Sequence, residues 1–216
     1  MDISGAKKIM GKNFIGPQEL KKISSQLGIS DPFKSKHLMP PILFSSDYLK
    51  KICKDYILIL GMPTAKGGEK LTINKMRAIF GRDPGKKEPC FYNQDWYIKE
   101  KFASAITLDF KWYVISRKIT EESRGQNPVL IAEGLPKNEK FPLAVLTAFT
   151  FFAYYFHSAG EILWKHDFIW CSDKDNSGDQ IYTGRYEDQN HINKNGFNIH
   201  RHLAIRPYYG LAPQLE

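Results

Sequence analysis

The sequence WKHDFIWCSDKDNSGDQIYTGRYEDQNHINKNGFNIHRHLAIRPYYGL, residues 164–211, carries the pattern that decides the fold. Near its end, apolar and polar side chains alternate along the chain. Successive side chains of a β-strand point to opposite faces of the sheet, so the alternation predicts a strand over residues 196–206. Its inward set is Phe197, Ile199, Leu203 and Ile205, and its outward set is Asn198, His200, His202 and Arg206. Arg201 interrupts the inward set.

The outward side chains of this stretch are long, polar and able to form hydrogen bonds in several ways. We expect the chain before residue 164 to build a rigid scaffold and residues 164–211 to present a binding surface. Tyrosine provides contact area at a small cost in conformational entropy, and asparagine provides adaptable hydrogen bonds. The candidate ligand-binding residues are Tyr182, Arg185, Asp188, Asn190, His191, Asn193, Asn195, Asn198, His200, His202, Arg206, Tyr208 and Tyr209.

Length and composition limit the classes of protein to consider. A chain of 216 residues is long enough for one core with a small appendage, and 42% hydrophobic residues are ordinary for a globular protein. The net charge of +8 permits contact with nucleic acid but is also typical of a soluble surface. The three cysteines are widely spaced without a C-x-x-C pair, which argues against a disulfide framework and a structural zinc site. We expect a reducing compartment and no cofactor.

The first 45 residues are predicted to form a separate N-terminal arm, followed by one domain over residues 46–216. The arm contains a short helix that begins at Pro17 and ends at Gly28, with Leu20, Ile23 and Leu27 at helical spacing. Two interpretations stay open: the helix binds a partner, or it packs on the main domain.

The order of predicted elements indicates an α+β fold. Ser45 and Thr72 are suited to cap helices, residues 56–60 and 109–117 have strand patterns, and a long apolar helix is expected over residues 143–157. The uncharged segment 141–156 is shorter than the roughly 20 residues of a membrane span, so a buried helix is predicted and no transmembrane segment. The N-terminus shows no signal-peptide pattern, so we expect cytoplasmic synthesis, with display by a partner or on a virion as an option.

Two clusters resemble metal sites. Residues 173–179, DKDNSGD, match the first half of a calcium-binding loop, but Gly184 stands at the twelfth position, where a carboxylate is needed. We therefore predict a polar hairpin turn. His191, His200 and His202 have the residue type of metal ligands, and an H-x-H strand pattern places two of them on one face. We interpret them as exposed contact residues, because no carboxylate is placed to support them.

The sequence contains one candidate catalytic centre, at Cys171. Cys171 is followed by Ser172 and Asp173, but the flanking sequence matches no thiol or serine hydrolase motif. Cys171, next to Trp170, is therefore predicted to be a small core residue at a strand end. An enzyme centred on Cys171 and Asp173 is the third functional hypothesis, and we expect the chain not to be an enzyme.

A nucleic-acid-binding surface is the second hypothesis. Tyrosines and arginines interleave over residues 182–209, a mixture that stacks on bases and pairs with phosphates. Protein-binding surfaces use the same mixture, and the many asparagines nearby favour that use. Residues 1–40 carry seven Lys but no Arg, so a base-reading site is not expected there.

The C-terminal pattern resembles a known fold family. The order W-C-S-D at residues 170–173, G-R-Y at 184–186, a strand rich in Asn, His and Arg, and Y-Y-G-L-A-P at 208–213 is similar to the C-terminal half of a C-type lectin fold. More narrowly, it resembles the variable proteins of diversity-generating retroelements. In that family, adenine-directed mutagenesis rewrites codons near the 3′ end of the gene, and a codon such as AAC becomes one for Asp, His, Tyr, Ser, Ile or Arg. The mixture at residues 190–209 is consistent with that origin.

The resemblance implies a C-type-lectin-like domain with two main helices and short antiparallel strands. The N-terminal helical arm that the sequence predicts before it has no counterpart in the resemblance. It also implies a non-enzymatic protein with a hypervariable surface, diversified by a retroelement and used for ligand binding through protein–protein interaction. The expected partner is a protein or glycan ligand on a cell or virus surface. The alternative is a nucleic-acid-binding accessory protein, although nucleic acid is not the expected partner.

Overall fold

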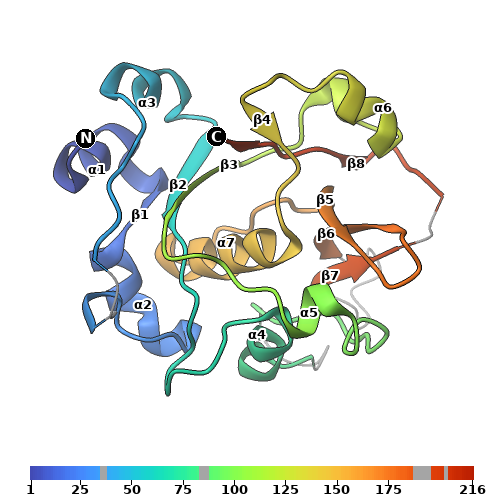
Figure 1. Ribbon diagram of the computed structural model, residues 1–216, viewed down its shortest axis with the longest axis horizontal. Coiled ribbons are helices and arrows are strands. Elements are labelled where there is room, and N and C mark those ends of the chain that lie inside the picture. The colour runs from blue at the N-terminus through green and yellow to red at the C-terminus, as the bar shows by residue number, and fades with distance from the viewer. Residues whose placement is uncertain (35–37, 83–87, 187–195, 202–203) are drawn as a thin grey trace.

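The fold is seen in a computed structural model that describes residues 1–34, 38–82, 88–186, 196–201 and 204–216. Within these residues the chain forms seven α-helices and two β-sheets (Figure 1). The predicted α+β class is confirmed. The helices outnumber the two main helices expected, because three of them already form before residue 53.

The first sheet has five strands in the order β1-β2-β3-β9-β4. At its centre, β2 (Tyr56–Leu60) and β3 (Trp112–Ser116) pair antiparallel along their full length. Nearly all of their residues are buried, as short apolar runs predict. The last strand of the chain, β9 (Gln214–Leu215), lies between β3 and β4 (Glu139–Lys140). Strands are therefore present in both segments where the sequence predicts them.

The N-terminal segment belongs to this sheet and its core. The strand β1 (Phe14–Ile15) pairs in parallel with β2, and α1 (Ile3–Met10) packs against α3 (Ser46–Ile52). The helix predicted to begin at Pro17 is α2 (Pro17–Leu27), and it packs against the long helix α7 (Ala144–His157). Its apolar side chains enter the same hydrophobic core as those of the later strands. Residues 1–34 therefore pack on the domain and do not form a detached arm.

The second sheet has four strands in the order β7-β6-β5-β8. β5 (Phe168–Lys174) and β6 (Gln180–Tyr186) form an antiparallel hairpin. β7 (Gly196–His200) pairs antiparallel with β6, and β8 (Tyr209–Gly210) pairs in parallel with β5. All four strands come from the C-terminal third of the chain.

Two carboxylates fix the hairpin and the helix beside it. The Asp175 carboxylate accepts hydrogen bonds from the backbone N–H groups of Ser177 and Asp179, both at 2.9 Å. The predicted polar hairpin turn is confirmed. Asp173 Oδ2 accepts the N–H of Ala144 at 2.6 Å and so satisfies one of the unpaired donors at the start of α7.

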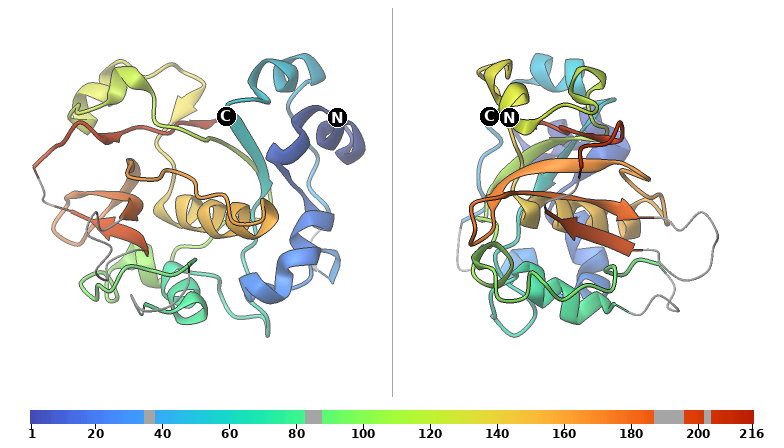
Figure 2. Two further views of the ribbon diagram at one scale, coloured as in Figure 1. Left: turned by 180° about the vertical axis from the view of Figure 1, so that it is seen from behind. Right: turned by 90° about the vertical axis from the view of Figure 1, so that its right-hand side faces the viewer.

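The helix α7 connects the two sheets, because it packs against β1 of the first sheet and against β5 and β6 of the second (Figure 1 and Figure 2). Its residues from Ala144 to Tyr154 are all buried, which confirms the predicted core helix. None of the helices in the described part of the chain has the length and apolar character needed to cross a membrane.

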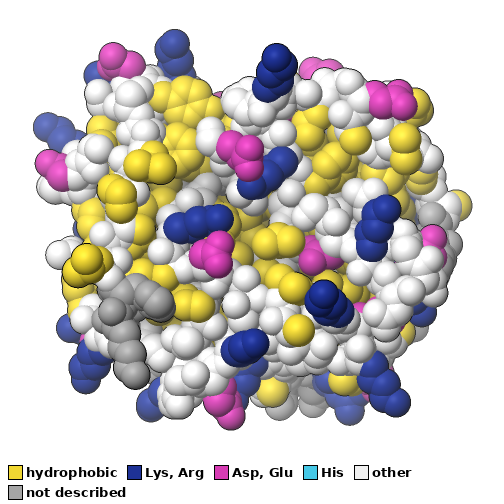
Figure 3. Space-filling view, in the orientation of Figure 1, with side chains coloured by type: hydrophobic (Ala, Val, Ile, Leu, Met, Phe, Trp, Pro, Cys, Tyr) yellow, Lys and Arg dark blue, Asp and Glu magenta, His cyan; other side chains and the backbone are white. Residues whose placement is uncertain are grey.

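Shorter helices lie on two sides of the second sheet. In Figure 1, α4 (Ile73–Phe80) and α5 (Lys101–Ser104) lie below it, and α6 (Pro128–Glu133) lies above it. The Thr72 side chain accepts the N–H of Lys75 at 3.2 Å, so the cap predicted for α4 is present. On the surface seen in this orientation, charged side chains are dispersed, whereas apolar side chains gather at the upper left and upper right (Figure 3).

Candidate functional site

The second sheet has two faces of different chemistry. Alternate residues of its strands point toward α7 and are buried: Ile169, Cys171, Ile181, Thr183, Phe197 and Ile199. The burial of Phe197 and Ile199 confirms the first part of the predicted alternation. The residues on the opposite side define a surface that we call the outer face: Phe168, Trp170, Tyr182, Asn198, His200 and Tyr209.

The pairing register places the residues of the outer face in two adjacent rows. Asn198 is opposite Gly184, which is opposite Phe168, which in turn is opposite Tyr209. In the next row, Tyr182 stands between its partners on β5 and β7, Trp170 and His200. Residues from four strands thus form one continuous surface.

Aromatic rings make up most of the outer face and form a cluster separate from the main core. The ring centroid of Tyr182 lies 4.8 Å from that of Tyr209 and 4.9 Å from that of Trp170. Phe168 lies 5.3 Å from Tyr209. Aromatic pairs attract one another at these distances. Burial raises the pKa of Tyr209, so its hydroxyl stays protonated at neutral pH. Three further side chains pack against the cluster: Ile131, Phe141 and Tyr208.

Asn198 places an unpaired amide on the outer face. Its side chain is 1% exposed, and neither its amide nitrogen nor its amide oxygen has a hydrogen-bond partner within the described residues. The indole nitrogen of Trp170 also lacks a partner in that part of the chain. Leaving a buried polar group unpaired costs about 1–3 kcal/mol, and folded proteins rarely do so. The outer face therefore offers hydrogen-bonding groups that the described chain does not use.

Gly184 permits a close approach over the outer face. A Cβ added at this position would lie 2.1 Å from the carbonyl oxygen of Asp167, which is too close for any other residue type. Trp164 and His166 adopt positive φ angles of 49° and 66°, in the left-handed region that non-glycine residues rarely use. The glycine thus lets the segment before β5 turn tightly and pass close to β6.

His200 stands at the open end of the second row. Its ring centroid lies 5.9 Å from Tyr182, and Gln94 Nε2 lies 3.1 Å from His200 Nε2. Burial lowers the pKa of His200 to about 4, because its surroundings disfavour the charged imidazolium. The imidazole is therefore neutral at pH 7.

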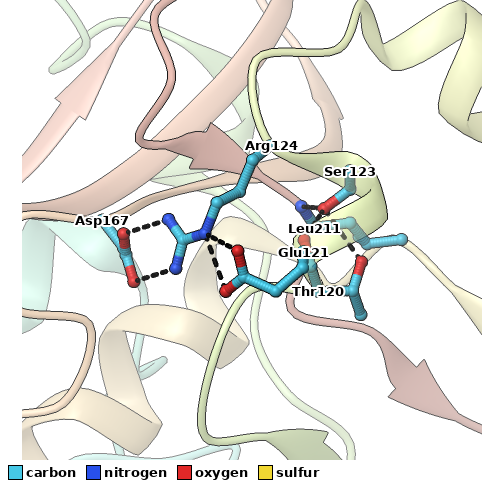
Figure 4. Close-up of polar contacts among 6 residues, drawn as sticks. All are labelled: Thr120, Glu121, Ser123, Arg124, Asp167 and Leu211. Carbon is cyan, nitrogen blue, oxygen red and sulfur yellow. Dashed lines mark hydrogen bonds and ion pairs between the residues drawn. The ribbon is translucent and has the colours of Figure 1, made fainter.

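Arg124 and Ser123 hold the two ends of the outer face (Figure 4). Arg124 Nη1 donates to Asp167 Oδ1 at 2.8 Å, and its Nε donates to the Glu121 carboxylate at 2.9 Å. Ser123 Oγ accepts the N–H of Leu211 at 2.8 Å. One short segment therefore fixes both the residue before β5 and the residue after β8.

Five of the predicted contact residues lie together on this side of the sheet. Tyr182, Asn198, His200 and Tyr209 belong to the outer face, and Tyr208 packs at its edge. The prediction that Asn198 points into solvent is wrong, because this face is covered. Tyr182 and Tyr209 are also buried, since their rings pack into the aromatic cluster and withdraw from water together.

Other predicted contact residues lie elsewhere. Arg185 is directed to the opposite side, is 4% exposed and donates from Nη2 to Glu88 Oε1 at 2.6 Å, which removes it from the predicted surface. A buried cation needs such a counter-charge. Arg206 is exposed, and its Nη1 donates to the Tyr208 hydroxyl at 3.1 Å. The remaining predicted residues lie outside the described ones: Asp188, Asn190, His191, Asn193, Asn195 and His202.

The strand predicted over residues 196–206 ends at His200. Arg201 leaves the sheet, because its guanidinium pairs with the Asp175 carboxylate and lies 4.4 Å from the ring centroid of Trp96. The prediction that Ile205 points inward is wrong, since its side chain is 39% exposed. The other inward residue of this part, Leu203, lies outside the described residues.

Sequence reasoning missed Phe168 and Trp170 as members of the site. The signal was present, because Phe168-Ile-Trp-Cys171 places an aromatic residue at every second position. An alternation of two aromatic residues with two smaller apolar ones indicates a strand buried on both faces. Such a strand places aromatic side chains on the sheet face that points away from the main core.

The two candidate catalytic residues, Cys171 and Asp173, have structural roles in the fold. Cys171 is fully buried, which confirms its prediction as a core residue, although it lies in the middle of β5 and not at a strand end. Burial raises the pKa of its thiol well above the usual range. Burial also raises the pKa of Asp173, whose carboxylate receives the N–H at the start of α7. Within the described ranges, no three His, Cys, Asp or Glu side chains are grouped to hold a metal ion.

Comparison of the chain with protein-family models, with curated proteins and with solved structures found no match.

Proposed function

We propose that the protein is a non-enzymatic ligand-binding protein whose contact surface is the outer face and the chain beside it. The ligand is a protein or a glycan on a cell or virus surface. The observation that carries this proposal is the Asn198 amide, which is buried on the outer face and has no partner within the described residues.

The composition of the outer face supports this proposal. Binding sites are mostly apolar and aromatic, with a few polar groups that fix the orientation of the ligand. Here the rings of Phe168, Tyr182 and Tyr209 provide the apolar area, and Asn198 offers both a donor and an acceptor. Sugar rings and peptide side chains both have surfaces that pack on aromatic rings and groups that pair with an amide.

The supports around the outer face keep the sheet fixed, so a ligand reaches the buried Asn198 amide only when the chain that covers this face moves aside. Gly184, the Arg124 contacts and α7 hold the sheet from different sides. A surface that is already ordered loses less conformational entropy when a ligand binds. The same scaffold can then tolerate sequence change at its exposed edge.

The finer part of the proposal is a C-type-lectin-like scaffold whose exposed contact positions are diversified by a retroelement. The antiparallel strands β5 to β7 and the residue mixture over 182–209 support it. Diversification is then limited to exposed positions such as Arg206, because exchange of the buried Asn198 or Tyr209 would disturb packing. Sequencing the 3′ end of the gene in many cells tests this idea. We expect substitutions at adenines concentrated in these codons, and an even spread over the gene would overturn it.

A binding screen tests the main proposal. A glycan array and a displayed peptide library are probed with the wild-type protein, with Asn198→Leu and with Leu43→Ser, a control at an exposed apolar residue elsewhere. We expect the selected ligands to bind Asn198→Leu at least about tenfold more weakly, which corresponds to about 1.4 kcal/mol. Binding to the control should be unchanged. Ligands that bind all three proteins equally would contradict the proposal.

The nucleic-acid hypothesis has weaker support. Arg185 and Arg201, two arginines of the interleaved stretch, are paired with carboxylates of the protein itself. Fluorescence anisotropy with labelled oligonucleotides at two salt concentrations separates the two functions. We expect weak binding that disappears near physiological salt, because binding to phosphates depends steeply on salt. Submicromolar binding that survives physiological salt and requires Arg206 would favour the nucleic-acid function instead.

A further inference from the structure

The helix α6 exposes apolar side chains on the surface. Its sequence is PVLIAE, yet none of its six residues is buried. Val129 is 62% exposed and Leu130 is 57% exposed. Figure 3 shows apolar side chains gathered at the upper right, over α6. Apolar side chains that form a patch, in contrast to isolated ones, mark interaction surfaces.

A hollow of about 420 Å³ lies against this helix. Its apolar lining is Leu130, Ile131, Leu135, Pro136 and Leu211. Ile131 also packs against the aromatic cluster of the outer face, so the base of the helix is attached to the domain while Val129 and Leu130 stay exposed. Leu130 lines the hollow and Val129 is its exposed neighbour on the helix, and we call this region the α6 groove.

The groove has the opposite charge to the molecule as a whole. Glu122 and Glu139 line it, and none of the described residues that line it is Lys or Arg. Within the described part of the chain, neither carboxylate forms an ion pair. Burial raises the pKa of Glu139, as expected for a carboxylate that has lost water without gaining a cation. In a chain with a net charge of +8, these two carboxylates are suited to a cationic partner.

We propose that the α6 groove docks a cationic amphipathic segment of a partner protein. An aliphatic side chain of the segment fills the hollow beside Leu130, and a neighbouring Lys or Arg pairs with Glu122 or Glu139. The apolar contact gives the affinity, and the charge pair selects the partner, because complementary charges mainly determine specificity and association rate. The groove adjoins the outer face, because Ile131 packs against the aromatic cluster, but the docking proposal does not require ligand binding by that face.

A peptide titration of the full chain tests this proposal. The probe is an acetylated heptapeptide of alternating Lys and Leu, and two control peptides replace its Lys with Ser or with Glu. Binding is followed by amide chemical shifts of the isotope-labelled protein. We expect saturable shift changes confined to residues 120–139 and 211, seen with the Lys peptide alone. The combined Glu122→Lys and Glu139→Lys variant, or Leu130→Ser, should weaken binding at least about tenfold, equivalent to about 1.4 kcal/mol.

Matched variants act as controls for nonspecific electrostatic binding and nonspecific hydrophobic binding of the peptide. Glu133→Lys changes an exposed carboxylate of the same helix that does not line the hollow, and Leu43→Ser changes an exposed apolar residue elsewhere. Both should bind the Lys peptide with less than about a twofold change, which corresponds to about 0.4 kcal/mol. Equal binding of the three peptides, shift changes away from the groove, or insensitivity to charge reversal would overturn the proposal. Self-association through α6 without any peptide would also overturn it, since the occupant would then be a second copy.

Discussion

The inner and outer faces of the second sheet use polar side chains differently. On the inner face, the Thr183 hydroxyl lies 2.8 Å from that of Thr147 and 3.5 Å from Cys171 Sγ, so it is satisfied within the core. On the outer face, one strand away, Asn198 is equally buried but has no partner among the residues that the structure describes. The difference teaches that equal burial does not mean equal pairing: the Thr183 hydroxyl has partners within the fold, whereas the Asn198 amide has none among the described residues.

Aromatic packing explains why the outer face can tolerate an unpaired amide. Full burial of a Phe-sized side chain stabilises a protein by about 1.5–3 kcal/mol, and an unpaired buried polar group costs about 1–3 kcal/mol. Four rings of the outer face are buried in one cluster. Their combined burial outweighs the cost of Asn198, so the sheet stays folded while its polar group stays unused.

The largest effect is expected on the inner face. Phe197 is fully buried, and its ring lies 5.1 Å from Phe151 and 5.6 Å from Phe91. Phe197→Ala leaves a cavity in the main core and should lower the free energy of unfolding by about 3–5 kcal/mol. Urea unfolding measures the change. A loss below about 1 kcal/mol would mean that the inner face does not carry the stability of the sheet.

The pH dependence of stability should show how strongly the outer face encloses His200. The folded state holds the pKa of His200 at about 4, below its usual 6.5, so the unfolded chain binds a proton more readily between these values. The contribution of His200 is fully present above pH 6.5 and is lost as the pH falls toward 4. Urea midpoints from pH 7 to pH 4 should therefore fall less steeply for His200→Gln than for the wild type. Parallel curves would show that His200 titrates normally and is not enclosed by the outer face.

The smallest effect is expected at the exposed edge of the site. Arg206 is exposed, and the partner of its guanidinium is the hydroxyl of the half-buried Tyr208. Arg206→Ala should change the free energy of unfolding by less than about 0.5 kcal/mol, because exposed side chains contribute little. Thermal melting checks this value. A clear destabilisation would mean that this edge is part of the scaffold and is not free to vary in sequence.

Much of the fold follows from local patterns in the sequence. The apolar runs at residues 56–60 and 112–116 form the central strands, and Ser45, Thr72 and Gly28 stand at helix ends as their residue types predict. These signals act within a few residues of chain and do not depend on distant contacts. The place of residues 1–34 in the core was harder to predict, because it depends on the pairing of β1 with β2 across 40 residues of sequence.

The site was only partly predictable, for two physical reasons. Alternation identifies residues that share a face, and it did place Asn198 and His200 on the same face of β7. Alternation does not reveal whether that face is covered, which here depends on aromatic rings from the three strands β5, β6 and β8. It also fails where a long-range contact ends a strand, as the Arg201 pairing with Asp175 does after His200.

The most direct test compares two substitutions on opposite faces of the same sheet. Asn198→Leu removes an amide that has no partner in the described ranges of the chain, and Thr183→Val removes a paired hydroxyl. We expect Asn198→Leu to leave the free energy of unfolding unchanged or to raise it by up to about 1–3 kcal/mol, and Thr183→Val to lower it by about 0.5–1.5 kcal/mol. Urea unfolding of both variants at pH 7 measures the two changes. If Asn198→Leu is the more destabilising of the two, its amide serves the fold, and the claim that the outer face is kept for binding is contradicted.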